Sequence, residues 1–278
     1  MTVAAEIQGI TLRGIEALPV EVESEITSGM FSFSVVGLPD AAVRESRERV
    51  RAALRELDIS IYGRIAVNLA PADLPKEGSL LDLPIAVALA CEKEYCSPPG
   101  AAIYMGELAL DGRVRSVRGA VPAAMLARSL GLPLFCPEGN AAEVALVDGV
   151  EAYCVPTLKD LLLFLRREKE LNRVVKNMPP SELNAVEPDF ADVKGQMTAR
   201  RALEIAAAGH HNILLVGSPG SGKTLMARAL QGILPPLSDD EFLETLLIRS
   251  AVGLPAPVDR RRPFRQVHHT ASTVSICG

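Results

Sequence analysis

The sequence predicts two α/β domains, and three observations support this prediction. The first half alternates short apolar runs, typical of buried strands, with segments whose apolar residues recur at helical spacing. Residues 168–188 are charged and contain the sequence Pro-Pro-Ser, a composition typical of a linker. A helical segment, an apolar run and a glycine-rich loop before a second helix then follow. We therefore expect a domain at residues 1–167, a linker at 168–188 and a domain at 189–278.

The composition indicates a globular protein of the cytoplasm. Of the 278 residues, 48% are hydrophobic, which is enough for a sizeable core. The five cysteines form no C-x-x-C pair, so we expect reduced thiols. The N-terminus lacks the pattern of a signal peptide, and no apolar run reaches the ~18 residues of a membrane span. The net charge of −5 argues against strong attraction of the whole molecule to nucleic acid, but a local basic patch remains possible in principle.

Apolar periodicity and turn residues locate the elements of the first domain. Asp82 is expected to cap a helix over residues 83–90, with Pro84 in its first turn. Strands are expected at residues 31–36, 65–70, 101–110, 134–136 and 153–155. Helices are expected at residues 41–57, 119–130, 141–147 and 158–167. In the second domain, residues 198–208 are expected to form a helix, residues 212–216 a strand and residues 223–230 a helix.

The glycine-rich loop after residues 212–216 satisfies the phosphate-loop pattern G-x-x-x-x-G-K-[ST]. Glycines allow successive backbone N–H groups to face a phosphate, and the positive end of the following helix favours the same charge. The lysine is placed to reach the β- and γ-phosphates, and the threonine hydroxyl to complete a Mg²⁺ shell. The sequence therefore predicts an ATP·Mg²⁺ site at Gly217, Ser218, Pro219, Gly220, Ser221, Gly222, Lys223 and Thr224.

Taken alone, the segment before this loop is a polar turn ahead of a helix. Together with the loop, it resembles the segment that touches the adenine in AAA+ ATPases, a family that works as rings, usually hexamers. The resemblance implies adenine contacts from Val193, Lys194, Gly195 and Gln196. The same family needs an apolar strand that ends in Asp-Glu, which no segment after Thr224 provides. We therefore expect an incomplete P-loop AAA+ parallel-sheet domain that binds ATP without hydrolysing it efficiently.

Residues 189–278 resemble the magnesium-chelatase-like AAA+ family in detail. The matching motifs are DVKGQ, RALEIAAAGHHNILLVGSPGSGKT, LPPLSDDE and RPFRQVHHTAS, in which Val267 replaces a usual proline. His268 and His269 are interpreted as loop residues rather than a metal pair, because adjacent residues do not share a helix face.

The first half resembles the Lon-protease-like domain, of the ribosomal S5 domain 2-like fold, that precedes the ATPase in the YifB/ComM branch of this family. The motifs are PKEG before LDLP, and GELALDGRV followed by a glycine and the loop PEGN. Lon-type proteases need a serine nucleophile and a lysine. The resemblance places the nucleophile position at Leu80, one residue after Ser79, and the lysine position at Val121. We therefore expect a non-proteolytic domain.

The YifB/ComM resemblance implies a hexameric, ATP-driven DNA motor that promotes branch migration during natural transformation and recombination. Two arginine clusters are candidates for DNA contact. The helix at residues 41–57 has five arginines against three glutamates and is interpreted as a solvated face. Residues 260–262 with Arg265 form a denser patch, for which phosphate contact and a subunit contact both stay open. The alternatives are a chelatase motor subunit for metal insertion into a porphyrin, an ATP-dependent protease, and a non-enzymatic ATP-binding fragment.

Overall fold

The computed structural model describes residues 7–97, 100–177, 188–257, 259–267 and 270–272. Contacts divide the chain into two compact units. The first unit comprises residues 1–178 and 243–256, and the second comprises residues 179–242 and 257–278. Residues 179–181 of the expected linker, and both His268 and His269, lie outside the described residues.

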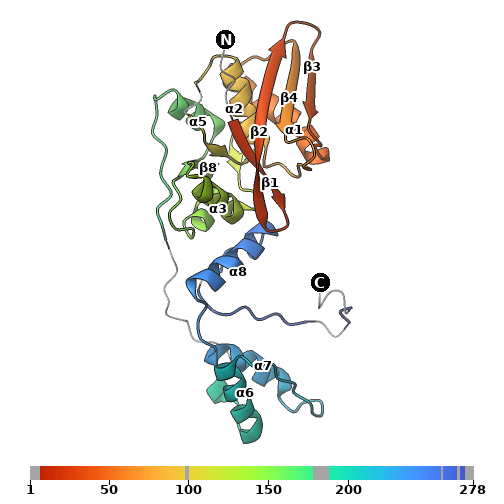
Figure 1. Cartoon of the computed structure of the whole chain (residues 1–278), viewed down its shortest axis with the longest axis vertical. Coiled ribbons are helices and arrows are strands. Elements are labelled where there is room, and N and C mark those ends of the chain that lie inside the picture. The colour runs from red at the N-terminus through yellow and green to blue at the C-terminus, as the bar shows by residue number, and fades with distance from the viewer. Residues whose placement is uncertain (1–6, 98–99, 178–187, 258, 268–269, 273–278) are drawn as a thin grey trace. The chain divides into compact units, whose positions relative to one another are not determined.

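A mixed seven-stranded sheet forms the centre of the first unit (Figure 1). The strand order is β3-β4-β2-β1-β5-β8-β9. β2 pairs antiparallel with β1 and β4, whereas the pairs β3–β4, β1–β5, β5–β8 and β8–β9 are parallel. The strands are β1 (Ile7–Arg13), β2 (Glu16–Thr27), β3 (Ser32–Val36), β4 (Arg64–Ala70), β5 (Ile103–Tyr104), β8 (Leu134–Pro137) and β9 (Ala152–Val155). A separate antiparallel pair joins β6 (Glu107–Leu108) to β7 (Val114–Arg115).

Five α-helices accompany this sheet: α1 (Ala41–Arg55), α2 (Asp82–Glu92), α3 (Ala120–Leu130), α4 (Ala141–Val144) and α5 (Leu158–Leu165). All five were expected from periodicity, although α4 is shorter than its apolar pattern suggested. The expected strand at residues 101–110 is two short strands, β5 and β6, separated by Gly106. The hairpin of β1 and β2 was not predicted.

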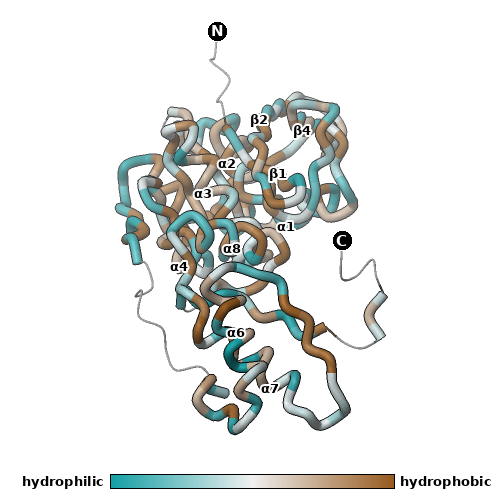
Figure 2. Tube along the Cα trace, turned by 60° about the horizontal axis from the view of Figure 1, so that its bottom comes forward, coloured by the Kyte–Doolittle hydropathy of each residue, from teal (hydrophilic) through white to brown (hydrophobic). Residues whose placement is uncertain are grey.

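Helix α2 is buried along most of its length and forms the core of the first unit. Its residues from Asp82 to Ala90 are all buried, and it packs on β1, β2 and α1. The hydrophobic segments of the chain gather where α2 meets these strands (Figure 2). Gly9 allows β1 to approach the start of this helix, because a Cβ atom on Gly9 would lie 2.5 Å from Leu81 Cδ2. The close approach explains why the strand carries no side chain there.

Aromatic rings extend the core across the parallel strands. Tyr104 on β5 stacks on Phe135 of β8 at 4.9 Å between centroids, and Phe135 stacks on Tyr153 of β9 at 5.2 Å. Phe164 of α5 meets Phe135 edge-on at 5.6 Å. Neighbouring strands thus contribute one continuous row of rings, a geometry that adds stability beyond the area buried.

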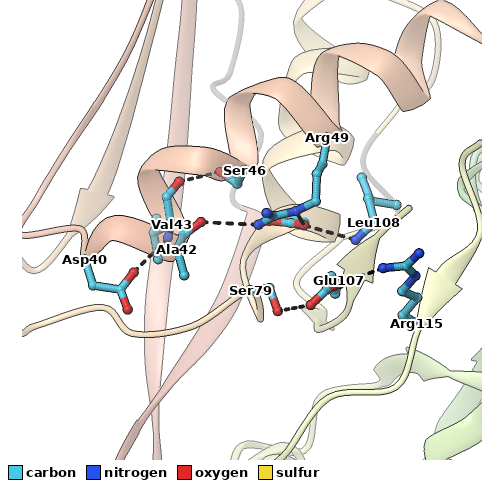
Figure 3. Close-up of polar contacts among 10 residues, drawn as sticks. Asp40, Ala42, Val43, Ser46, Arg49, Ser79, Glu107, Leu108 and Arg115 are labelled. Atoms are coloured by element: carbon cyan, nitrogen blue, oxygen red, sulfur yellow. Dashed lines mark hydrogen bonds and ion pairs between the residues drawn. The ribbon is translucent and has the colours of Figure 1, made fainter. Parts of the chain in front are cut away.

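Asp82 does not cap α2, so the expected capping role is wrong. The helix begins at Asp82 itself, and its N-cap residue makes no side-chain hydrogen bond. The carboxylate instead accepts hydrogen bonds from Arg49 Nε at 2.6 Å, Arg49 Nη2 at 3.0 Å and Leu108 N at 3.1 Å (Figure 3). Burial raises the pKa of the Asp82 carboxyl, and the bonds from Arg49 oppose that rise. This ion pair ties α1 to α2 and β6.

Residues 171–174, which were expected to belong to the linker, contact the first unit. Cys154 N donates to Asn172 O at 2.8 Å, and Val174 N donates to Ala152 O at 2.8 Å, so the chain after α5 lies against β9. Leu171 is buried there. The domain bounds at residues 167 and 188 stay predictions, but these hydrogen bonds place residues 171–174 on the first unit.

The second unit is helical in its described residues. It contains α6 (Met197–Gly209), α7 (Lys223–Ala229), the 3-10 turns Phe190–Asp192 and Leu230–Ile233, and the start of α8 (Asp239–Ala251). Its small core consists of Phe190, Val193, Leu203, Met226 and Ala229. The expected strand at residues 212–216 is not formed, because no described segment pairs with it. Leu214 and Val216 remain 85% and 86% exposed.

Candidate nucleotide-binding site

The glycine-rich loop joins residues 212–216 to α7 in the second unit. Gly220 and Gly222 have φ angles of +79° and +86°, a region that residues with a side chain rarely adopt. Gly222 is also the N-cap of α7, so the loop turns directly into the helix. The φ angle of Gly222 explains the second glycine of the motif, and Gly220 supplies a further glycine at a position that the motif leaves open. The local fold agrees with the loop-then-helix prediction.

Lys223 folds back over the loop that precedes it. Its ammonium group donates hydrogen bonds to Gly217 O at 2.9 Å, to Ser218 O at 2.7 Å and to Ser221 Oγ at 3.2 Å. The backbone oxygens of the loop thus hold the positive charge beside the first turn of α7. An incoming phosphate oxygen would find this charge already in position, with the exposed Thr224 next to it.

A cavity of about 420 Å³ lies beside Lys223 and Thr224. This volume falls in the range of small-molecule pockets, roughly 300–1,000 Å³. Its walls combine apolar side chains, such as Leu203 of α6 and Phe264, with the guanidinium-bearing Arg265. The sequence grouped Arg265 with the basic patch of residues 260–262, and its place beside the loop was missed. Arg265 belongs to the RPFR motif, and this motif gives no local indication of the contact with the loop.

The predicted adenine segment divides into a buried and an exposed part. Val193 is buried against Leu203 and Met226, so it adjoins both α6 and α7. Lys194, Gly195 and Gln196 are exposed. The structure therefore brings Val193 next to the helix that follows the phosphate loop. The adenine contacts of the four residues stay a prediction.

The basic patch at residues 260–262 is neutralised within the second unit. Arg260 pairs with Asp239, and Arg261 pairs with Asp259 at 3.2 Å. Arg262 forms two hydrogen bonds of 2.9 Å with the carboxylate of Glu241. The three arginines hold the end of the chain against the start of α8. This arrangement disfavours the interpretation of the patch as a phosphate-binding surface.

In the first unit, the two positions that correspond to a Lon-type dyad are both apolar and buried. Leu80 is 2% exposed and Val121 is fully buried. Ser79, one residue before Leu80, donates its hydroxyl hydrogen to Glu107 Oε2, and Arg115 Nη1 donates to Glu107 Oε1 at 3.3 Å (Figure 3). Lys76 is also buried, and its ammonium group donates a hydrogen bond to Pro71 O. Ser79 is therefore held by a carboxylate that is itself engaged by an arginine.

The described ranges contain no group of three or more His, Cys, Asp and Glu side chains that would hold a metal ion. Within the same ranges, no helix is both long and apolar enough to cross a membrane.

Both halves of the chain match known families. Residues 22–140 match the family described as subunit ChlI of Mg-chelatase, and residues 189–278 match magnesium chelatase, subunit ChlI. The uncharacterized protein YifB of Salmonella typhimurium is 41% identical over 271 residues, and competence protein ComM of Haemophilus influenzae is 39% identical over 273 residues. Each match covers 95% of this chain but 53% and 54% of the relative, so the chain spans about half the length of these proteins.

A shorter match concerns the Lon-like motifs. An archaeal Lon protease of Halobacterium salinarum is 41% identical over 51 residues, which is 18% of this chain and 7% of the protease. The long matches to YifB and ComM, together with the two chelatase-subunit families, decide the classification. This α/β chain belongs to the YifB/ComM family of magnesium-chelatase-like AAA+ proteins.

Proposed function

We propose that the chain binds ATP with Mg²⁺ at the loop Gly217–Thr224. The observation that carries the proposal is the ammonium group of Lys223, held by Gly217 O and Ser218 O at the start of α7. The magnesium-chelatase-like family implies nucleotide binding, which agrees with this geometry. Phosphate binding at a helix start needs backbone N–H groups and a nearby cation, and the loop supplies both.

The residues present fit a nucleoside triphosphate with its metal. Gly220 and Gly222 leave the loop free of side chains where a phosphate must approach closely. Lys223 exchanges its bonds to loop carbonyls for bonds to the β- and γ-phosphates, while Thr224 supplies a hydroxyl ligand to Mg²⁺. When bound, the metal neutralises phosphate charge. Arg265 lines the same cavity and adds a second cation.

Nucleotide binding is the activity proposed for these 278 residues. In AAA+ proteins, hydrolysis also uses an apolar strand that ends in Asp-Glu, which assists Mg²⁺ and activates the attacking water. The described residues of the second unit form no strand. The proposal for the loop therefore concerns affinity.

Titration with a fluorescent ATP analogue tests the site. Lys223→Ala should weaken binding about 10- to 100-fold, because hydrogen bonds to charged groups contribute about 1.5–3 kcal/mol each. Thr224→Ala should lower affinity in Mg²⁺ but change little in EDTA. Lys159→Ala, which removes an exposed lysine from α5 of the first unit, is the matched control. Equal affinity for wild type and Lys223→Ala would reject the site.

We further propose that the chain is part of a DNA-directed AAA+ motor that assembles as a hexameric ring. The support is 39% identity to a competence protein across 95% of the chain. A chimera in which residues 1–278 replace the matching half of that relative tests this proposal. The chimera should restore natural transformation in a strain that lacks the relative, and its Lys223→Ala variant should not. A folded chimera with intact ATP binding and no transformation would count against the motor.

A chelatase motor subunit is the second candidate function. The observation in its favour is the description of both matching families as the ChlI subunit of magnesium chelatase. The long matches to YifB and ComM favour the DNA motor instead, because they cover both units of the chain together. Stimulation of metal insertion into a porphyrin, in the presence of partner chelatase subunits, would reverse this preference.

We also propose that the first unit has a Lon-like, ribosomal S5 domain 2-like fold without protease activity. The 51-residue match to a Lon protease supports the fold, and the buried Leu80 and Val121 at the dyad positions support the loss of activity. A hydroxyl without a lysine or histidine base is a poor nucleophile. Casein should therefore remain intact on incubation with the chain. Cleavage that disappears in Ser79→Ala would overturn this proposal.

A further inference from the structure

Four arginines of α1 form a stripe along the exposed face of the helix. Arg44, Arg47, Arg51 and Arg55 are separated by three, four and four residues, which places them within an arc of about 80° on a helix of 3.6 residues per turn. All four are exposed. The buried residues of α1, including Val43, Val50 and Leu54, lie on the side of the helix next to Arg47. From Arg44 to Arg55 the stripe is roughly 16 Å long at 1.5 Å per residue.

The stripe is basic, with Glu48 beside it. Arg49 lies off the stripe and is committed to Asp82. Arg47 has an exposed partner in Glu48 at 3.5 Å, which contributes little because solvent screens it. Within the described ranges, no acidic side chain lies in ion-pair distance of Arg51 or Arg55. The whole molecule is acidic, so this concentration of positive charge is a local feature.

Aromatic side chains flank the stripe. The guanidinium of Arg51 lies 4.5 Å from the centroid of Phe31, which is 45% exposed just before the edge strand β3 (Figure 1). Tyr62 is 73% exposed. A hollow of about 80 Å³ is shared by Arg51, Arg55 and Tyr62. A second hollow of about 70 Å³ joins Arg51 to Phe31 and Phe33, and Arg47 and Glu48 also line it. Arg51 therefore lines both hollows.

Exposed arginines beside exposed rings match one class of partner. Single-stranded nucleic acid offers phosphates to arginines and unstacked base faces to aromatic rings. A duplex offers phosphates but keeps its bases stacked, so Phe31 and Tyr62 would gain nothing from it. Acidic peptides and anionic lipid surfaces would use the arginines alone. We infer that Arg44, Arg47, Arg51, Arg55, Phe31 and Tyr62 form a binding surface for single-stranded DNA on the first unit.

This inference rests on the DNA-directed part of the proposed function, and it is independent of the nucleotide site. Fluorescence anisotropy with a labelled oligo(dT) strand and the full chain is the test. Arg51→Ala/Arg55→Ala should weaken binding at least 10-fold at 0.1 M salt. The slope of log affinity against log salt should fall by about 1.4, because each phosphate contact on a single strand contributes about 0.7.

Substitutions of Tyr62 test how much its aromatic ring contributes to binding. Tyr62→Ala should weaken binding about 5- to 150-fold, since stacking on one base contributes about 1–3 kcal/mol, whereas Tyr62→Phe should retain affinity. The matched control is Arg13→Ala/Arg201→Ala, which removes two exposed arginines elsewhere and changes the net charge equally. The control should keep wild-type affinity, and all variants should keep ATP binding.

The outcomes separate the inference from the proposed function. Wild-type binding to oligo(dT) with no loss in the stripe variants would overturn the surface while leaving a DNA motor possible through other residues. No binding to any DNA by the wild type would count against both. Loss of binding to a duplex, an acidic peptide or phosphatidylserine vesicles, with oligo(dT) binding unchanged, would assign the stripe to a different partner. Circular dichroism checks that each variant is folded.

Discussion

The ion pair between Arg49 and Asp82 is the polar contact on which the core of the first unit depends most. Asp82 is fully buried, and the side chain of Arg49 keeps 21% exposure. A carboxylate in such a place is tolerated only because three donors satisfy it. The sequence grouped Arg49 with the solvated arginines of α1. Its partner lies 33 residues further along the chain, so no local pattern indicates the pair.

Removing the carboxylate should therefore destabilise the first unit. For Asp82→Ala we expect a loss of about 3 kcal/mol in the free energy of unfolding, since breaking a buried pair leaves a charge without its partner. Urea unfolding followed by circular dichroism measures it. Asp111→Ala breaks the exposed pair with Arg113 and should leave stability nearly unchanged, because solvent screens that pair. Equal effects of the two substitutions would contradict the buried-pair account.

The pair between Glu241 and Arg262 makes a second residue-scale prediction, in the second unit. Hydrogen bonds from Arg262, and then from Ser238 N, hold the pKa of the Glu241 carboxyl below its ordinary value of 4.5. A depressed carboxyl pKa means that the pair stabilises the folded chain above pH 4.5 and is lost as the pH falls through the folded pKa.

Arg262→Ala should raise the pKa of Glu241 toward 4.5, measured by NMR titration of the side-chain carboxyl carbon. Arg261→Ala, whose partner is Asp259, should leave that titration unchanged. If the Glu241 pKa is the same in the wild type and Arg262→Ala, the arginine is not the cause of the shift. The test also bears on function, because it measures whether the basic patch is occupied by carboxylates rather than free for phosphates.

At the scale of elements, the packing of α2 on β1 depends on the absence of a side chain at Gly9. A Cβ atom there would lie 2.5 Å from Leu81 Cδ2 and 3.0 Å from Pro84 Cγ. Both neighbours belong to the start of a buried helix and have little room to move. We expect Gly9→Ala to reduce stability by about 1–3 kcal/mol, as overpacking does. Unfolding by urea measures this, and an unchanged or higher midpoint would show that the helix start adjusts freely.

Most helices, several strands and the phosphate loop could be predicted from sequence because their signals are local. Apolar spacing located α1, and the glycine and lysine spacing located the loop before α7. The hairpin β1–β2 was missed because Pro19 interrupts the strand pattern of β2. The structure accommodates Pro19 because β2 pairs only with β1 there, and its ladder to β4 begins at Glu21.

The failed predictions depended on contacts that no local pattern contains. The apolar run at residues 212–216 predicted a strand, yet a strand exists only where another strand offers hydrogen-bonding groups, and no described segment does so. Asp82 has the residue type of a helix cap, but Arg49 is a stronger partner for its carboxylate. Arg265 reaches the candidate site through the fold of the second unit. Each case required a tertiary neighbour.

At the scale of the whole molecule, two units carry two different tasks in this account. The second unit presents the nucleotide loop and the first presents the arginine stripe. Both surfaces are proposed to bind phosphate, the loop through backbone N–H groups and one lysine, and the stripe through guanidinium groups and rings. Substitutions in one should therefore leave the other intact, because sites without shared partners behave additively.

Nucleotide binding at Lys223 is the central claim, and isothermal titration calorimetry with ATP and Mg²⁺ tests it most directly. The account predicts one site per chain in the wild type and in Lys159→Ala, with affinity reduced about 10- to 100-fold in Lys223→Ala, a loss of roughly 1.4–2.8 kcal/mol. No heat of binding in the folded wild type, or identical affinities in all three proteins, would contradict it.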